Sequence, residues 1–288
     1  DIQFSSLAEA LDFAPDAAVI ASPASAHLAM AMPLAMAGIP LLIEKPLADR
    51  LDGVDQLIAT ARAPVMVAYN LRFMPSLAEA RRLVHAGVVG DVHAVRAEVG
   101  QYLPGWRPSK SYRHTVSAQK KLGGGALLEL SHEFDYLYWI FGPPALVNAS
   151  GGRYSALEID VEDLVSVNLI YENPRRLIHV HLDLLQRATT RYCKFIGSEG
   201  TLRWDGIADS LECFDPGMGS WRVIHAEPCP DRNATYVNEL SHFLDCAASG
   251  QTPLIDLNAA RDVLAIVEAA KASISHDCSI ALKDYARH

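Results

Sequence analysis

Cysteine is scarce in this sequence, and its five residues form neither pairs nor clusters: Cys193, Cys213, Cys229, Cys246 and Cys278. Disulfide frameworks and structural zinc sites need paired cysteines such as C-x-x-C, so the sequence argues against both and favours a reducing cytoplasm. The chain also lacks an apolar run of the ~18 residues needed to cross a bilayer, and no signal-peptide pattern opens it. We therefore expect no membrane partner.

Clusters of basic residues are absent as well. The net charge is −9 at pH 7, and the doublet Arg81-Arg82 is typical of a solvated helix face. This balance argues against nucleic acid as a partner. The chain has 288 residues, half of them hydrophobic, which is long enough for two domains with their own cores.

The first quarter of the chain alternates short apolar runs with amphipathic segments. The apolar runs predict buried parallel strands, because strands covered on both faces lose their polar alternation. Strands are expected at 17–21, 41–43 and 64–69, and helices at 27–37 and 52–61. Such alternation implies right-handed crossovers and half of a doubly wound α/β domain.

The remainder predicts an α+β domain with a large, mainly antiparallel open sheet, because its strands are joined by tight turns. We place the boundary near Tyr69, giving domains 1–69 and 70–288. The expected strands are 92–99, 164–171, 176–185, 192–196 and 200–205, and the expected helices are 77–86, 123–141, 236–248 and 257–273. In the helix over 236–248, Leu240, Phe243, Leu244 and Ala247 should form the buried stripe.

Polar residues follow each predicted parallel strand, where open α/β sheets bind ligands. These segments are Ser22-Pro23, Glu44-Lys45-Pro46 and Tyr69-Asn70. Lys45 directly after a buried strand can donate a proton or hydrogen bond to a substrate oxygen. The alternative for Glu44-Lys45 is a loop salt bridge.

The predicted helix over 123–141 carries a second group of candidates. Glu129, His132 and Asp135 are spaced three apart, which places them on one helical face. A histidine held by a carboxylate can act as a general base near neutral pH. The alternative is a helix-surface pair without chemistry, although Gly123-Gly124-Gly125 at the entry would let backbone approach a ligand closely.

Two further patterns have structural interpretations. Gly123-Gly124-Gly125 is not a phosphate loop, because it lacks G-x-G-x-x-G spacing and no strand leads into it. His179, His181 and Asp183 share one face of a strand, but without a further ligand we expect a sheet-face or interface role and no metal.

Together these segments resemble the Gfo/Idh/MocA family, named for glucose–fructose oxidoreductase, inositol dehydrogenase and a rhizopine-catabolism protein. The resemblance covers nearly the whole chain and rests on five elements in order. They are 18–23 with His27, Glu44-Lys45-Pro46, 69–73, 123–129 with His132, and 236–273.

The resemblance implies a Rossmann-like first domain that binds NAD or NADP, and oxidation or reduction of a sugar, nucleotide-sugar or cyclitol carbon. It assigns catalysis to Lys45 and His132. The family commonly has Asp, three residues and then His on this helix, whereas Glu129 and His132 enclose only two residues. The carboxylate partner of His132 is therefore either Glu129 or Asp135. Cofactor contacts are expected from Ser22, Pro23, His27, Glu44, Lys45 and Asn70. Substrate contacts are expected from Trp106, Arg107, Lys110 and Arg113, whose cations would suit an anionic or nucleotide-linked sugar; a solvated loop is the alternative.

The family's opening strand and G-x-G-x-x-G turn have no counterpart in these residues. The resemblance therefore predicts that roughly 60 residues precede Asp1, and that the first sheet is truncated. Without that turn, weak NAD(H) binding is expected. The alternative is a shortened, non-catalytic homologue that binds a sugar or a partner. The open sheet favours a homodimer or homotetramer.

Overall fold

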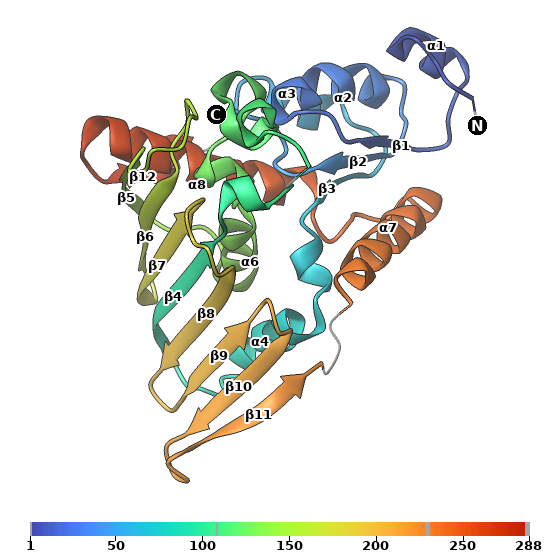
Figure 1. Cartoon of the computed structure of the whole chain (residues 1–288). Coiled ribbons are helices and arrows are strands. Elements are labelled where there is room, and N and C mark those ends of the chain that lie inside the picture. The colour runs from blue at the N-terminus through green and yellow to red at the C-terminus, as the bar shows by residue number, and fades with distance from the viewer. Residues whose placement is uncertain (1, 108, 228–230, 286–288) are drawn as a thin grey trace.

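The computed structural model describes residues 2–107, 109–227 and 231–285, which form a small parallel sheet and a large mixed sheet (Figure 1). This architecture confirms the predicted fold class. None of the described helices is long and apolar enough to span a bilayer. Cys193, Cys213, Cys246 and Cys278 are free thiols, whereas Cys229 lies outside the described residues.

The small sheet has the predicted parallel order β1–β2–β3. Its strands are β1 (Ala18–Ile20), β2 (Leu41–Glu44) and β3 (Val65–Ala68), connected by helices α2 (His27–Met36) and α3 (Val54–Thr60). Ile20 pairs with Ile43, and Ile43 pairs with Val67, so all three strands end at the same side of the sheet. These ends hold the polar residues singled out from the sequence.

The two edges of the small sheet differ. On the β3 side, Val67 N–H donates to Ile255 O at 3.0 Å, and Met66 forms an antiparallel bridge with Asp256. No described strand pairs with the outer side of β1, where Val19 is 58% exposed. A short helix, α1 (Leu7–Asp12), precedes β1 and was not expected from the sequence.

The large sheet has nine described strands in the order β11–β10–β9–β8–β4–β7–β6–β5–β12. Only β4 and β7 pair in parallel among them, so the sheet is mainly antiparallel, as predicted. The strands are β4 (Val92–Gly100), β5 (Leu146–Gly152), β6 (Leu164–Glu172), β7 (Arg175–Asp183), β8 (Thr190–Gly197), β9 (Thr201–Asp205), β10 (Ser210–Asp215), β11 (Ser220–Ala226) and β12 (Ile280–Ala281).

The sequence did not predict strands β5, β10, β11 and β12. The β5 sequence contains Asn148, Ser150 and two glycines, which local propensity disfavours in strands, yet full pairing with β6 imposes the extended form. β10 and β11 form a hairpin around 215–220, where Asp215 Oδ1 accepts backbone hydrogen bonds from Gly217 and Met218. Tertiary pairing therefore decides these strands.

Helices cover one face of the large sheet. Helix α4 (Pro75–His85) packs against β9, β10 and β11, α6 (His132–Phe141) against β4, and α8 (Leu257–His276) against β5. Along β6, Val165, Val167 and Leu169 are fully buried, whereas Ser166 and Asn168 between them are half-buried on the other face. No described helix covers that second face.

Helix α7 (Arg232–Ser249) bears out the predicted apolar stripe at Phe243 and Ala247 but not at Leu240 and Leu244. Leu240 and Leu244 are 43% and 50% exposed, whereas Thr235, Glu239, Phe243 and Cys246 are buried. The helix packs against the 3₁₀ turn η2 (Asn70–Phe73), where the Phe73 and His242 rings lie 5.5 Å apart. Because η2 offers polar partners, the helix turns a mixed polar face inward.

Candidate functional site

The site is built where the three parallel strands end. Ser22 follows β1, Lys45 follows β2, and Tyr69 and Asn70 follow β3. Ser22 Oγ is buried and has no hydrogen-bond partner among the described residues. Glu44 and Lys45 are both half-buried, so their charged groups remain within reach of a ligand at the strand ends.

His27 fixes the loops that leave β1 and β2. Its ring is 1% exposed, and Nδ1 and Nε2 lie 2.9 and 2.8 Å from the carbonyl oxygens of Pro46 and Ser22. Carbonyl oxygens can only accept, and a neutral ring has one N–H, so such a ring donates to one of these two carbonyls and only contacts the other. Both ring nitrogens thus contact backbone carbonyls of the chain itself, and the expected cofactor contact of His27 stays a prediction.

The predicted long helix over 123–141 is broken into α5 (Ala126–Glu129) and α6. Leu130 and Ser131 separate them, so Glu129 ends one helix and His132 begins the next. Carbonyls at a helix end lack an intrahelical donor. Lys45 Nζ donates to the Glu129 carbonyl at 2.7 Å, and the Glu129 carboxylate lies 3.9 Å from Nζ. The break therefore creates the acceptor that positions Lys45.

The glycines before α5 pack against the chain itself. Gly125 has φ +105°, a left-handed conformation that favours glycine, and a Cβ there would collide with the Glu162 carboxylate. A Cβ on Gly124 would collide with the carbonyl oxygens of Val116 and Ser117. The close approach that these glycines permit in the structure is to neighbouring loops of the chain.

His132 is poised as a neutral imidazole. Its ring meets the Tyr69 ring edge-on with centroids 5.5 Å apart, and Nδ1 is buried without a partner among the described residues. Burial lowers the pKa of His132 well below its usual range, and the positive charges of Arg191 and Lys45 lower it further. The charge of Lys45 thus reaches His132, which places the two residues near one another at the strand ends.

Asp135 does not hold His132. Its two carboxylate oxygens accept from Arg72 Nη2 at 2.7 Å and Nε at 3.0 Å, in an ion pair that is almost completely buried. Its neighbour Glu133 pairs with Arg191 at 2.9 Å. Glu129 lies in α5, whereas His132 and Asp135 lie in α6. The spacing of three residues between Glu129 and His132 therefore does not place the three candidates on one helical face.

Two of the four expected substrate residues reach Glu129. Trp106 and Arg107 line a cavity of about 120 Å³ together with Glu129, and Trp106 Nε1 is buried without a partner among the described residues. Arg113 instead pairs with Glu158, and Lys110 is exposed. The structure thus brings together Trp106 and Arg107 and leaves the other two outside this cavity.

Asn70 and Glu239 join α7 to the site. Asn70 Nδ2 donates to Thr235 Oγ1 at 2.8 Å, which fixes the start of α7. Glu239 is 3% exposed, and its Oε1 has no partner among the described residues. Burial, reinforced by the charges of Glu44 and Asp135, raises the pKa of Glu239 to about 8. Sequence reasoning missed Glu239 because a single glutamate beside Leu240 carries no periodic signal.

The histidines on β7 have ordinary sheet partners. His181 Nδ1 lies 3.1 Å from Ser166 Oγ and its Nε2 lies 3.3 Å from Asp183, whereas His179 Nδ1 lies 3.2 Å from Asn168 Oδ1. Within the described residues, no group of three or more His, Cys, Asp or Glu side chains is arranged to hold a metal ion.

The strand-end residues fit a polar ligand. Of the six buried side-chain polar atoms that lack partners among the described residues, three belong to this group: Ser22 Oγ at the end of β1, His132 Nδ1 beside Lys45, and Glu239 Oε1 near Glu44. Buried polar groups are normally hydrogen-bonded, so these atoms call for an outside partner. A ligand that carries both hydrogen-bond donors and acceptors would supply such partners.

Comparisons with known proteins agree with this geometry. Residues 2–70 match the description "Oxidoreductase family, NAD-binding Rossmann fold", and residues 77–203 match "GFO/IDH/MocA C-terminal domain".

Among proteins of similar sequence, trans-1,2-dihydrobenzene-1,2-diol dehydrogenase of Bos taurus is 28% identical over 250 residues, covering 80% of this chain and 69% of the relative. Inositol 2-dehydrogenase 1 of Saccharopolyspora erythraea is 27% identical over 250 residues, covering 83% and 69%. An oxidoreductase of Synechocystis is 35% identical over 131 residues, covering 44% of this chain and 34% of its own. The matches thus span from about a third to about two thirds of these relatives.

Solved structures show the same fold. A levoglucosan dehydrogenase in complex with NADH superposes with a TM-score of 0.87 at 19% identity, covering 97% of this chain and 83% of that chain. An oxidoreductase from Agrobacterium radiobacter in complex with NAD+, L-tartaric acid and magnesium gives a TM-score of 0.82 at 20% identity, covering 96% and 82%.

Proposed function

Because this chain belongs to the Gfo/Idh/MocA family of oxidoreductases, we propose that it transfers a hydride between NAD or NADP and a hydroxyl-bearing carbon of a sugar, nucleotide sugar or cyclitol. The observation that carries this proposal is the meeting of Lys45, the Glu129 carbonyl and neutral His132 beside the ends of β2 and β3. Ligands bind at this edge of open parallel sheets.

His132 is the proton acceptor in this proposal. A bound nicotinamide would accept the hydride from the carbon, and the substrate oxygen then becomes far more acidic. A neutral imidazole of low basicity suffices to take that proton, because the proton is released only as the hydride leaves. Burial and the charge of Lys45 keep His132 in this neutral form.

Lys45 orients the substrate oxygen. An ammonium has three donors, and the Glu129 carbonyl occupies one of them at 2.7 Å. The remaining donors face the substrate oxygen and stabilise negative charge that develops on it during transfer. Glu129 therefore acts on Lys45 through its backbone carbonyl, and we assign it a positioning role.

Ser22, Pro23, Glu44 and Asn70 would hold the nicotinamide end of the cofactor. Dihydrodiol and inositol dehydrogenases among the relatives, and levoglucosan dehydrogenase among the similar structures, act on hydroxylated rings, which supports a polyol substrate. Trp106 Nε1 and Arg107 beside Glu129 supply donors for its further oxygen atoms.

The test uses the full-length gene product, NAD and NADP in turn, and a panel of inositols, aldoses and nucleotide sugars. The proposal is supported if at least one of these compounds reduces the nicotinamide and if the substitution His132→Asn abolishes that reduction. Binding of a sugar without any NAD(H) binding would favour the shortened, non-catalytic alternative instead.

Three further expectations stay proposals. We place the domain boundary at 69–70, between the last strand of the small sheet and η2. We propose a homodimer or homotetramer through the face of the large sheet that no described helix covers, which a monomeric mass in light scattering at micromolar concentration would contradict. We also propose a cytoplasmic location, on the strength of the unpaired cysteines.

A further inference from the structure

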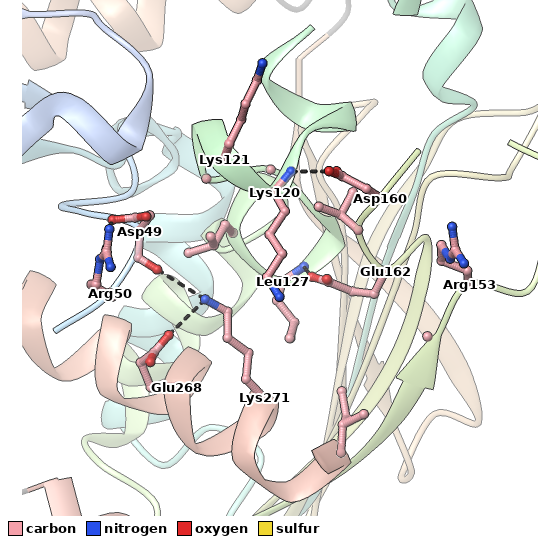
Figure 2. Close-up of a pocket in the computed structure, with 16 residues that line it drawn as sticks. Asp49, Arg50, Lys120, Lys121, Leu127, Arg153, Asp160, Glu162, Glu268 and Lys271 are labelled. Atoms are coloured by element: carbon pink, nitrogen blue, oxygen red, sulfur yellow. Dashed lines mark hydrogen bonds and ion pairs between the residues drawn. The ribbon is translucent and has the colours of Figure 1, made fainter. Parts of the chain in front are cut away.

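A second pocket lies beside α5, which contributes Leu127 and Leu128 to its lining, and neither Lys45 nor His132 lines it. Its volume is about 640 Å³, and four segments form its walls: the loop after β2, the glycine-rich loop before α5, the 152–162 segment, and α8 (Figure 2). A cavity of this size is in the range that holds small molecules. None of the residues assigned to hydride transfer lines it.

Three cations of its lining, Lys120, Lys121 and Arg153, form no ion pair with an acidic side chain among the described residues, and two of these three face the pocket. Within the described residues, Asp49 pairs with Arg50, and Glu268 pairs with Lys271, whose Nζ also donates to Asp49 O. Lys120 and Arg153 form no ion pair there; Arg153 donates to the Ile159 carbonyl instead. Figure 2 shows Lys120 extending toward Glu162 and Arg153 on the opposite wall, whereas Lys121 points away.

Two carboxylates stand beside these cations and accept only from backbone. Glu162 Oε1 accepts from Leu127 N–H at 3.1 Å, and Asp160 Oδ1 accepts from Lys120 N–H at 2.6 Å. Each carboxylate retains lone pairs for further donors. The pocket therefore offers cationic donors on two walls and carboxylate acceptors between them.

We propose that this pocket binds a small polyhydroxylated oxyanion, such as a sugar phosphate or a sugar acid, at a site separate from hydride transfer. Lys120 and Arg153 would bind the phosphate or carboxylate by charge-assisted hydrogen bonds. Asp160 and Glu162 would accept from the neighbouring hydroxyls. A simple anion such as phosphate has no hydroxyl donors on carbon for Asp160 and Glu162, so these carboxylates would only repel its charge. A ligand that also carries hydroxyl groups is therefore preferred.

The pocket also contacts the element that positions Lys45. Glu162 accepts from Leu127 through its carboxylate and from Ala126 N–H through its backbone carbonyl at 3.1 Å. These two residues begin α5, which ends at Glu129. A ligand engaging Glu162 is therefore separated from the Lys45 acceptor by a single four-residue helix.

The experiment is calorimetric titration of the full-length protein with glucose 6-phosphate and with gluconate, and with inorganic phosphate and glucose as partial ligands. At least one of the first two should bind at millimolar concentration or below, and each partial ligand should bind at least about tenfold more weakly. In the double variant Lys120→Gln/Arg153→Gln, affinity should fall by about a hundredfold, since each charge-assisted contact contributes about tenfold. The control Arg175→Gln removes an exposed charge from the start of β7 and should leave affinity unchanged.

Three results would overturn the proposal: no binding of either compound at millimolar concentration, equal affinity in the double variant, or inorganic phosphate binding as tightly as the sugar phosphate. Lys45→Met separates this inference from the hydride-transfer proposal. It should abolish turnover and leave the titration unchanged, whereas loss of binding would place the ligand in the catalytic site.

Discussion

Lys45 Nζ lies 2.7 Å from the carbonyl oxygen of Glu129, a residue 84 positions further along the chain. This hydrogen bond joins the end of β2 to the end of α5, and thereby joins the two sheets at the site. The carbonyl is available because α5 stops at Glu129. A helix break and a strand end together position the ammonium.

Replacing Lys45 with methionine should lower kcat by roughly 10²–10⁴-fold, the contribution typical of a proton-transfer group. Methionine keeps the stem of the half-buried side chain, so the thermal unfolding midpoint should stay close to that of the wild type. Steady-state kinetics on the full-length protein with an accepted polyol measure the effect, and Lys45→Arg controls for charge. Turnover reduced by less than about tenfold would remove Lys45 from the mechanism.

The acid limb of the oxidation pH profile should lie below pH 6.5. The pKa of folded His132 is lowered from 6.5 by burial and by Arg191 and Lys45, so the imidazole stays neutral as the pH falls through that value. The same shift stabilises the fold above pH 6.5, and this contribution is lost as the pH falls toward the folded pKa. The profile of kcat/KM against pH measures the first effect. An acid limb centred at or above pH 6.5 would contradict the assignment.

Glu239→Gln should stabilise the protein at alkaline pH. Burial raises the pKa of this carboxyl from 4.5 to about 8, so the folded state retains a proton that the unfolded state has lost. The native state is therefore destabilised as the pH rises from 4.5 through about 8, by roughly 5 kcal/mol at most. Glutamine stays neutral and removes this cost.

Urea unfolding at pH 5 and pH 9 measures the Glu239 effect. The gain in unfolding free energy from Glu239→Gln should be larger at pH 9 than at pH 5. Glu199→Gln, at an exposed glutamate, serves as the control and should show no such dependence. An equal effect of Glu239→Gln at both pH values would mean that Glu239 is ionised throughout this range.

The buried Arg72–Asp135 pair predicts non-additive stability changes. Arg72→Met leaves the Asp135 carboxylate uncompensated in the interior and should destabilise the fold by roughly 3–5 kcal/mol. The double variant Arg72→Met/Asp135→Leu removes both charges and should recover most of that loss. Chemical unfolding of these two variants and of the single variant Asp135→Leu completes the cycle. If the two single losses simply add in the double variant, the pair does not behave as a unit.

The sequence by itself determined the small parallel sheet. Its three strands are continuous apolar runs, their spacing leaves room only for short crossovers, and the ends of those runs located Ser22, Lys45 and Asn70 at one edge. The glycine-rich segment before His132 was also recognisable in the sequence. Gly123 and Gly125 have φ angles of +83° and +105°, which few residues other than glycine adopt. These features are local, so the residues concerned carry their own signal.

The tertiary structure alone decided how these residues meet. The break at Leu130–Ser131, the commitment of Asp135 to Arg72 and the burial of Glu239 all depend on partners far away in the sequence. Periodicity predicted one uninterrupted helix and an apolar stripe through Leu240, because it records side-chain spacing and not what lies opposite each face. Desolvation and ion pairing are set by that opposite surface, and they determine the charge states on which the proposed chemistry depends.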